Sequence, residues 1–354
     1  MNAELLQTTI DPAHVALPSA AALATRWRWL AIASVLAAAC CWATQGIAYG
    51  LILDGIQTDG LTVVTLRAIT ATVLLWGWLA ITDRSALKIP RSDLPTFAVL
   101  GLVAITIFYP ALFYAYAWTS VSVATTLLYL APALVTLGAA AFLGEALTRG
   151  KSVALVLTFV GSALIVQIAQ PANLTGNAAG IALGLVAAAS YATYSLLGKH
   201  LLRRHRMATV MAAYLLLGTL LLLALKLIVA PTTWPVPREA LTIGLYTGVM
   251  TTLVPITLFT FGLSRLPSGD ATILLTFEPV VAFVLAAVVL GESLDTVQWL
   301  GAGAVLGGVL LLTICGRPPI RTDIMRQRRS HREPRRCWIG ARIGCRQPLP
   351  LHPI

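Results

Sequence analysis

The chain has 354 residues, of which 58% are hydrophobic and only 11% charged, with a formal net charge of +11 and a mean hydropathy of +0.82. A water-soluble globular fold needs more polar surface than this composition supplies, which excludes that class. The five cysteines show no metal-ligand spacing, and Cys40 and Cys41 lie within an apolar stretch. We therefore expect neither a disulfide framework nor a metal or other cofactor.

Apolar runs of about 20 residues recur along the chain, and each has the length that crosses the hydrocarbon core of a bilayer. The runs lack the alternating pattern of a barrel strand, so each is predicted to be an α-helix. Ten spans are predicted, at residues 28–52, 60–82, 94–116, 121–143, 151–168, 178–198, 208–230, 239–264, 270–290 and 297–315. The sequence therefore predicts an all-α integral membrane protein.

Basic residues indicate the orientation of the spans, because cytoplasmic loops of membrane proteins carry an excess of Lys and Arg. With the N-terminal segment 1–27 inside, the outside loops hold only Arg238. Both termini are therefore predicted to face the cytoplasm, in a multi-pass protein of the cytoplasmic membrane. The tail, residues 316–354, carries ten arginines between Arg317 and Arg346. We expect it to be disordered and to contact membrane lipid rather than nucleic acid.

The chain also contains an internal repeat. The sequences ATTLL at 124–128 and LGEAL at 143–147 match ATILL at 271–275 and LGESL at 290–294 without a gap, and Pro132 falls on Pro279. The two units, residues 28–168 and 177–315, each contain five predicted helices. Because five is odd, the second unit crosses the membrane in the opposite direction to the first. Inverted repeats of this kind allow two equivalent packings around a central site, which predicts transport by alternating access.

Several short motifs are shared with a known family. They are the Trp42-Ala43-Thr44 stretch, Leu66-Arg67, the Leu-Gly-Glu endings of the fourth and ninth spans, and Glu278-Pro279. In their order and duplication these motifs resemble the EamA domains of the drug/metabolite transporter superfamily, over about residues 28–315. The resemblance implies ten helices, cytoplasmic termini and the movement of small polar metabolites such as amino acids. The long basic tail departs from the family pattern, and we infer no function from it.

Two charged residues lie within the predicted spans. Arg67 in the second span is costly to bury unless it faces a cavity or a partner, so it is a candidate for binding a carboxylate, with capping of nearby carbonyls as the structural alternative. Glu278 is the single deep acidic residue, and a carboxyl group there can exchange a proton during transport. Its structural alternative is a protonated side chain that bonds a neighbouring helix.

Four prolines occupy matching spans of the two repeats and are candidates for kinks and gates. They are Pro110, Pro132, Pro255 and Pro279. The residues that end the fourth and ninth spans are expected to be structural and to lie on opposite sides of the membrane. They are Gly144 and Glu145 in the first repeat, and Gly291 and Glu292 in the second.

Aromatic and polar residues near the span centres are candidates for lining a substrate cavity. They are Trp42, Gln45, Phe113, Tyr114, Tyr129, Tyr191 and Tyr194. Gly303 and Gly307 form a small-xxx-small pair that serves either a homodimer seam or, as we expect, close packing within the bundle.

The leading hypothesis is a secondary transporter that exports a small polar metabolite, an amino acid or a related compound, with protons as the candidate coupling ion. No Gly-rich phosphate loop is present to support ATP-driven transport. The alternatives are a passive channel or facilitator and an integral-membrane enzyme. The enzyme alternative is disfavoured because no histidine lies within a predicted span.

Overall fold

The computed structural model describes residues 20–45, 59–119, 121–165, 178–231, 238–290 and 295–315. Every regular element within these ranges is a helix, which confirms the prediction of an all-α protein. Seven helical stretches in this part of the chain are long and apolar enough to cross a membrane. Apolar side chains also cover outer faces: Ile81 is 86% exposed and Ile228 is 78% exposed. Such a surface is suited to lipid rather than to water.

The two repeats have the same succession of elements. The first contains α1 (Ala20–Ala43), α3 (Gly60–Thr82), α4 (Leu94–Gly101), the π-helical turn η4 (Leu102–Ile107), α5 (Phe108–Trp118), α6 (Val121–Leu128), α7 (Ala131–Phe142) and α8 (Arg149–Ile165). The second contains α9 (Ala178–Leu202), α10 (Met207–Val229), α11 (Arg238–Gly248), the π-helical turn η6 (Val249–Leu253), α12 (Val254–Arg265), α13 (Ser268–Leu275), α14 (Glu278–Leu290) and α15 (Thr296–Cys315). Two 3-10 turns, η2 (Arg84–Leu87) and η3 (Arg91–Asp93), connect α3 to α4.

Prolines explain why four of the predicted spans are irregular. A proline has no amide hydrogen for the carbonyl four residues earlier, and its ring crowds that carbonyl, so a regular α-helix cannot continue through it. The π-helical turns η4 and η6 end shortly before Pro110 and Pro255. Helix α7 begins just before Pro132, and α13 ends at Leu275, four residues before Pro279. The irregularities of these spans therefore lie close to the four prolines.

The repeats meet along a seam between α3 and α10. Thr72 and Thr219, which are separated by 147 residues, share a hydrogen bond of 2.8 Å between their hydroxyls. Ion pairs join the same two helices at each end. Asp59 lies 3.5 Å from the buried Nζ of Lys226, and Asp83 lies 2.5 Å from Arg206. Equivalent residues that touch each other indicate that the pseudo-two-fold axis passes through this seam.

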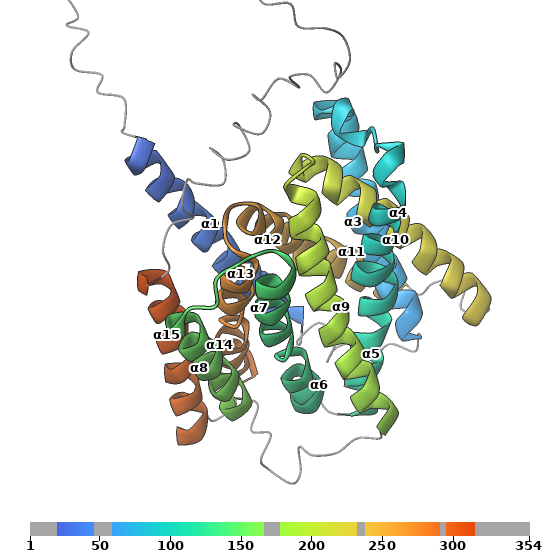
Figure 1. Ribbon diagram of the computed structural model, residues 1–354. Helices are drawn as coiled ribbons and strands as arrows, with labels where there is room; N and C mark the ends of the chain where they lie inside the picture. Colours follow the sequence, from blue (N-terminus) through green and yellow to red (C-terminus); the bar gives the residue numbers. More distant parts are fainter. Residues whose placement is uncertain are drawn as a thin grey trace, which may run out of the picture. The chain divides into compact units, whose positions relative to one another are not determined.

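Helices α8 and α15 form a second symmetric contact, and they lie side by side at one edge of Figure 1. A Cβ atom at Gly161 would come within 2.6 Å of the Gly301 carbonyl oxygen, and one at Gly308 within 2.9 Å of the Ala154 carbonyl oxygen. Both pairs lie at equivalent positions of the repeats. The absence of a side chain at these glycines is what allows the two helices to approach so closely.

Helix α1 begins at Ala20, before the span predicted from residue 28, because hydropathy locates the apolar part of a helix and not the turns that precede it. One expectation about the helices is wrong. Gly303 and Gly307 were expected to pack within the bundle, yet a Cβ atom at either would meet no atom within 4 Å. They lie on the exposed face of α15, whereas Gly301 and Gly308 form the packed face.

Candidate substrate cavity

A cavity of about 340 Å³ lies among the helices of both repeats. Its size is that of a site for a small molecule. It is lined by most of the side chains that the sequence singled out. They are Trp42, Gln45, Arg67, Tyr129, Tyr191, Tyr194 and Glu278, together with Pro132 and Pro279. The structure therefore brings residues from α1, α3, α9 and α14 into one site.

Arg67 is 3% exposed and donates hydrogen bonds through three different nitrogen atoms. Its Nε donates to the Thr252 hydroxyl, its Nη1 to Gln45 Oε1 at 3.0 Å, and its Nη2 to the Thr251 carbonyl at 2.7 Å. The guanidinium also lies 4.3 Å from the centre of the Tyr109 ring, where the face of an aromatic ring attracts a cation. These contacts offset the cost of burying the charge and hold the side chain against the cavity wall.

Trp42 shares an acceptor with Arg67. Its indole Nε1 donates to the Thr251 carbonyl at 2.9 Å, and its ring packs against Phe259 with centroids 5.8 Å apart. In a regular α-helix the Thr251 carbonyl would accept from the amide four residues later. That residue is Pro255, which has no amide hydrogen and so does not compete for the carbonyl. Pro255 does not line the cavity but acts on it through this acceptor.

Glu278 is the first residue of α14, at the break between α13 and α14. It lines the cavity beside Tyr129 and Tyr191. Because the helix is interrupted here, Glu278 does not lie in the middle of a regular helix, and its side chain lines the cavity. Its repeat-equivalent is Ala131, which also lines the cavity. The acidic side chain is thus a feature of the second repeat alone.

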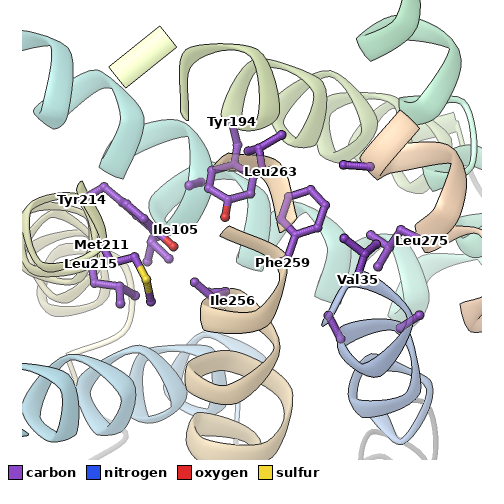
Figure 2. Close-up of a cluster of buried hydrophobic side chains, with 14 of the residues drawn as sticks. Val35, Ile105, Tyr194, Met211, Tyr214, Leu215, Ile256, Phe259, Leu263 and Leu275 are labelled. Atoms are coloured by element: carbon purple, nitrogen blue, oxygen red, sulfur yellow. The ribbon is translucent and has the colours of Figure 1, made fainter. Parts of the chain in front are cut away.

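Aromatic rings form much of the remaining wall. Tyr194 lies 6.0 Å from Tyr191, 5.7 Å from Tyr214 and 6.2 Å from Phe259, measured between ring centroids. Figure 2 shows the hydroxyl ends of Tyr194 and Tyr214 turned toward each other, with Phe259 and Ile256 beside them. A wall of this kind offers ring faces for apolar or cationic groups and hydroxyls for polar ones.

The cavity lining continues toward one end of the bundle, here called the Gln45 end. Gln45, Ile165 and Gln298 lie there, and Gln298 Nε2 donates to the Ile165 carbonyl at 3.2 Å. Arg28, near the other end of α1, donates to the Thr313 carbonyl near the other end of α15. This contact fixes α1 and α15 as antiparallel, so Gln45 and Gln298 belong to the same end.

The opposite end, here called the Glu145 end, is held together by contacts between the repeats. Glu145 accepts from the backbone amides of Ser268 at 2.7 Å and Gly269 at 3.3 Å, and so caps the N-terminus of α13. Lys151 Nζ lies 2.7 Å from Asp270 and 3.9 Å from Glu145. Within the second repeat, Lys199 Nζ donates to the carbonyls of Leu263 and Leu266 at the C-terminal end of α12. Here only Glu145 was anticipated from the sequence, as a structural residue.

The remaining candidates lie elsewhere. Tyr114 is not a lining residue and packs against Phe113 and Trp118, because it projects from α5 on a different side from Leu112 and Tyr116, which do line the cavity. Phe113 covers Gly60, and Pro110 and Pro255 lie outside the lining. Gly144 has a φ of 69°, which glycine adopts without strain. Gly291 and Glu292 lie outside the described residues.

Sequence reasoning missed the acceptors of Arg67, Thr251 and Thr252. One signal for them is present in the sequence. Gly244 and Gly248 are four residues apart on α11 and contact α3 at Leu66 and Thr70. This spacing allows close helix approach and places the next turn, η6, beside the arginine.

Comparison with known proteins agrees with this architecture. The profile of the EamA-like transporter family matches residues 29–167 and again residues 178–314. The chain belongs to the EamA-like transporter family. It is therefore a multi-pass membrane transporter rather than an enzyme, as the sequence predicted, and its two EamA-like units are the two repeats described above.

Relatives of this EamA-like chain include named exporters. It is 31% identical over 258 residues to an uncharacterized transporter of Archaeoglobus fulgidus, covering 72% of this chain and 86% of the relative. It is 28% identical over 275 residues to a probable terminal-alkyne amino-acid exporter of Streptantibioticus cattleyicolor, covering 77% of this chain and 89% of that relative. It is 28% identical over 162 residues to the threonine/homoserine exporter RhtA of Escherichia coli, covering 46% of this chain and 54% of that relative.

A solved structure supports the fold. It superimposes with a TM-score of 0.69, at 18% identity, over 81% of this chain and 97% of its own. At this low identity the likeness concerns the fold alone.

Proposed function

We propose that the chain exports a small zwitterionic metabolite, an amino acid or a close relative of one, by alternating access. The observation that carries the proposal is a single cavity, formed by both repeats, that is lined by Arg67, Glu278 and aromatic rings. A guanidinium presents several donors suited to a carboxylate, and aromatic faces attract an ammonium group. Two relatives, a probable terminal-alkyne amino-acid exporter and a threonine/homoserine exporter, support the same class of substrate.

In this proposal Arg67 binds the substrate carboxylate, and Glu278 takes up and releases a proton. An ionisable residue at membrane depth is costly and is typically retained for such a relay. In this proposal the exchange is an antiport, in which a proton that enters the cell through Glu278 drives the substrate outward. The aromatic wall would hold the substrate side chain.

The proposed orientation places the Glu145 end in the cytoplasm. Lys151, Lys199 and Arg203 lie at this end, and cytoplasmic segments carry the excess of basic residues. The cavity lining reaches the Gln45 end, so this conformation would face the exterior, with the cytoplasmic end closed by Glu145, Lys151 and Asp270. Alternating access would open these contacts and close the Gln45 end.

Purified protein in proteoliposomes tests the function. Radiolabelled amino acids loaded inside are expected to exchange with external amino acid, and net flux is expected to follow an imposed pH gradient. Flux that follows only the amino-acid gradient would instead support a passive facilitator. Reporter fusions near residues 145 and 292 are expected to report opposite faces of the membrane. A common face for the two positions would contradict the inverted repeats on which the mechanism depends.

A further inference from the structure

The orientation of Arg67 depends on a close contact between α3 and α11. A Cβ atom at Gly248 would lie 2.5 Å from Thr70 Cβ and 3.0 Å from the Arg67 carbonyl oxygen. One at Gly244 would lie 2.8 Å from Leu66 Cβ. The two glycines therefore bring the backbone of α11 against the turn of α3 that carries Arg67. The π-helical turn η6 follows directly, so its polar atoms face the guanidinium.

Two acceptors in η6 are oriented toward Arg67 by their own bonding. The Thr252 hydroxyl donates its proton to the Thr247 carbonyl at 3.0 Å, so its oxygen is left to accept from Arg67 Nε. The Thr251 carbonyl receives Arg67 Nη2 and the indole of Trp42. Pro255 provides no amide to compete for that carbonyl.

The symmetric position shows that the fold itself does not require these contacts. Tyr214 is the repeat-equivalent of Arg67. Its carbonyl oxygen lies 2.7 Å from a Cβ atom built at Gly101, and the Arg67 carbonyl oxygen lies 3.0 Å from one built at Gly248. The same close helix packing thus occurs with a tyrosine in place of the arginine. Both side chains line the cavity, but only the arginine bonds a π-helical turn through its guanidinium.

We propose that the turn from Thr247 to Pro255 is the positioning element of the substrate site, with Thr252 as the residue that fixes the guanidinium plane of Arg67. This inference rests on the proposed function, in which Arg67 receives the substrate carboxylate. Arg67 and Gln45 belong to the first repeat and Thr251 and Thr252 to the second. A rearrangement of the repeats therefore also reorients the arginine, which couples the conformation of the carrier to its affinity for carboxylates.

Thr252→Val and Thr252→Ser test the positioning role directly. Thr242→Val is the matched control, because the exposed Thr242 hydroxyl donates within its own helix, α11, to the Arg238 carbonyl and does not line the cavity. In protein labelled with ¹⁵N-arginine, the Nε resonance of Arg67 is assigned by its loss in Arg67→Lys. We expect Thr252→Val to shift that resonance and speed its exchange with water, and Thr252→Ser and Thr242→Val to leave it unchanged. An unmoved resonance in Thr252→Val, or equal effects of Val and Ser, would overturn the proposal.

Transport supplies the second arm, with L-threonine and L-threoninol, which lacks the carboxylate, as probes. Thr252→Val is expected to raise KM for threonine about tenfold with little change in kcat, because a hydrogen bond to a charged group is lost. Threoninol is expected to be a poor competitor of threonine in the unmodified protein and no poorer in the variant. If threonine is not transported at all, the proposed substrate class fails, while the Nε resonance still decides the positioning role.

Discussion

The ionic contacts at the Glu145 end make a quantitative prediction. Lys151 and Asp270 are 12% and 11% exposed in their side chains and 2.7 Å apart, and Glu145 is the next carboxylate. Lys151→Met would leave two acidic groups together without the cation, but only while this end is closed. Breaking a buried pair by removing one partner costs about 3 kcal/mol at the lower end of the usual range. That cost would shift the balance between closed and open forms about 100-fold toward the open one.

Cysteine accessibility measures this shift. Thr136 is 3% exposed, and its hydroxyl lies 3.1 Å from a Cβ atom built at Gly269, next to the capped start of α13. In a background without other cysteines, Thr136→Cys is expected to react slowly with a membrane-impermeant maleimide applied from the Glu145 side. Lys151→Met should accelerate the reaction strongly, and Lys151→Arg, which keeps the charge, should not. An unchanged rate in a well-folded Lys151→Met protein would show that these contacts do not hold this end closed.

Three further predictions concern coupling, the tail and acid stability. Glu278→Gln is expected to abolish the response of transport to a pH gradient while expression stays normal, and an unchanged response in proteoliposomes would remove Glu278 from the coupling mechanism. Truncation after Cys315 is expected to leave transport, measured as efflux from cells, nearly normal. A truncated protein that is well inserted but inactive would contradict this prediction. The hydrogen bond from Ser85, and then the ion pair with Arg206, lower the pKa of Asp83, so its contribution to stability is present at neutral pH and lost as the pH falls through that lowered pKa. Asp83→Asn should therefore lower the thermal midpoint at pH 7 and have no effect at a pH where the carboxyl is already protonated.

The sequence predicted the all-α fold well, because its signals are local properties. Apolar length defines a membrane span, and a proline such as Pro279 interrupts an α-helix wherever it occurs. Arg67 and Glu278 were identified because burial of a charge is costly whatever surrounds it. These features need no knowledge of the neighbouring helices.

Features that depend on contacts between distant helices could not be predicted in the same way. Thr252 is one of many threonines in apolar segments, and its importance follows only from its bond to Arg67, which is 185 residues away. Tyr114 was grouped with the cavity residues because its sequence position is central, yet the rotation of α5 places it elsewhere. Gly303 and Gly307 have the spacing of a packing motif, but the rotation of α15 directs Gly301 and Gly308 toward α8 instead.

The threonine pair on the seam between α3 and α10 has a mechanical consequence. Because Thr72 and Thr219 are related by the symmetry and touch each other, a rocking of one repeat against the other moves this point least. In such a rotation, atomic displacement grows with distance from the axis, so a small tilt at the seam moves the ends of the more distant helices much further. In the proposed alternating access, substitutions in the seam should therefore alter the rate of turnover between the two faces and leave substrate affinity unchanged.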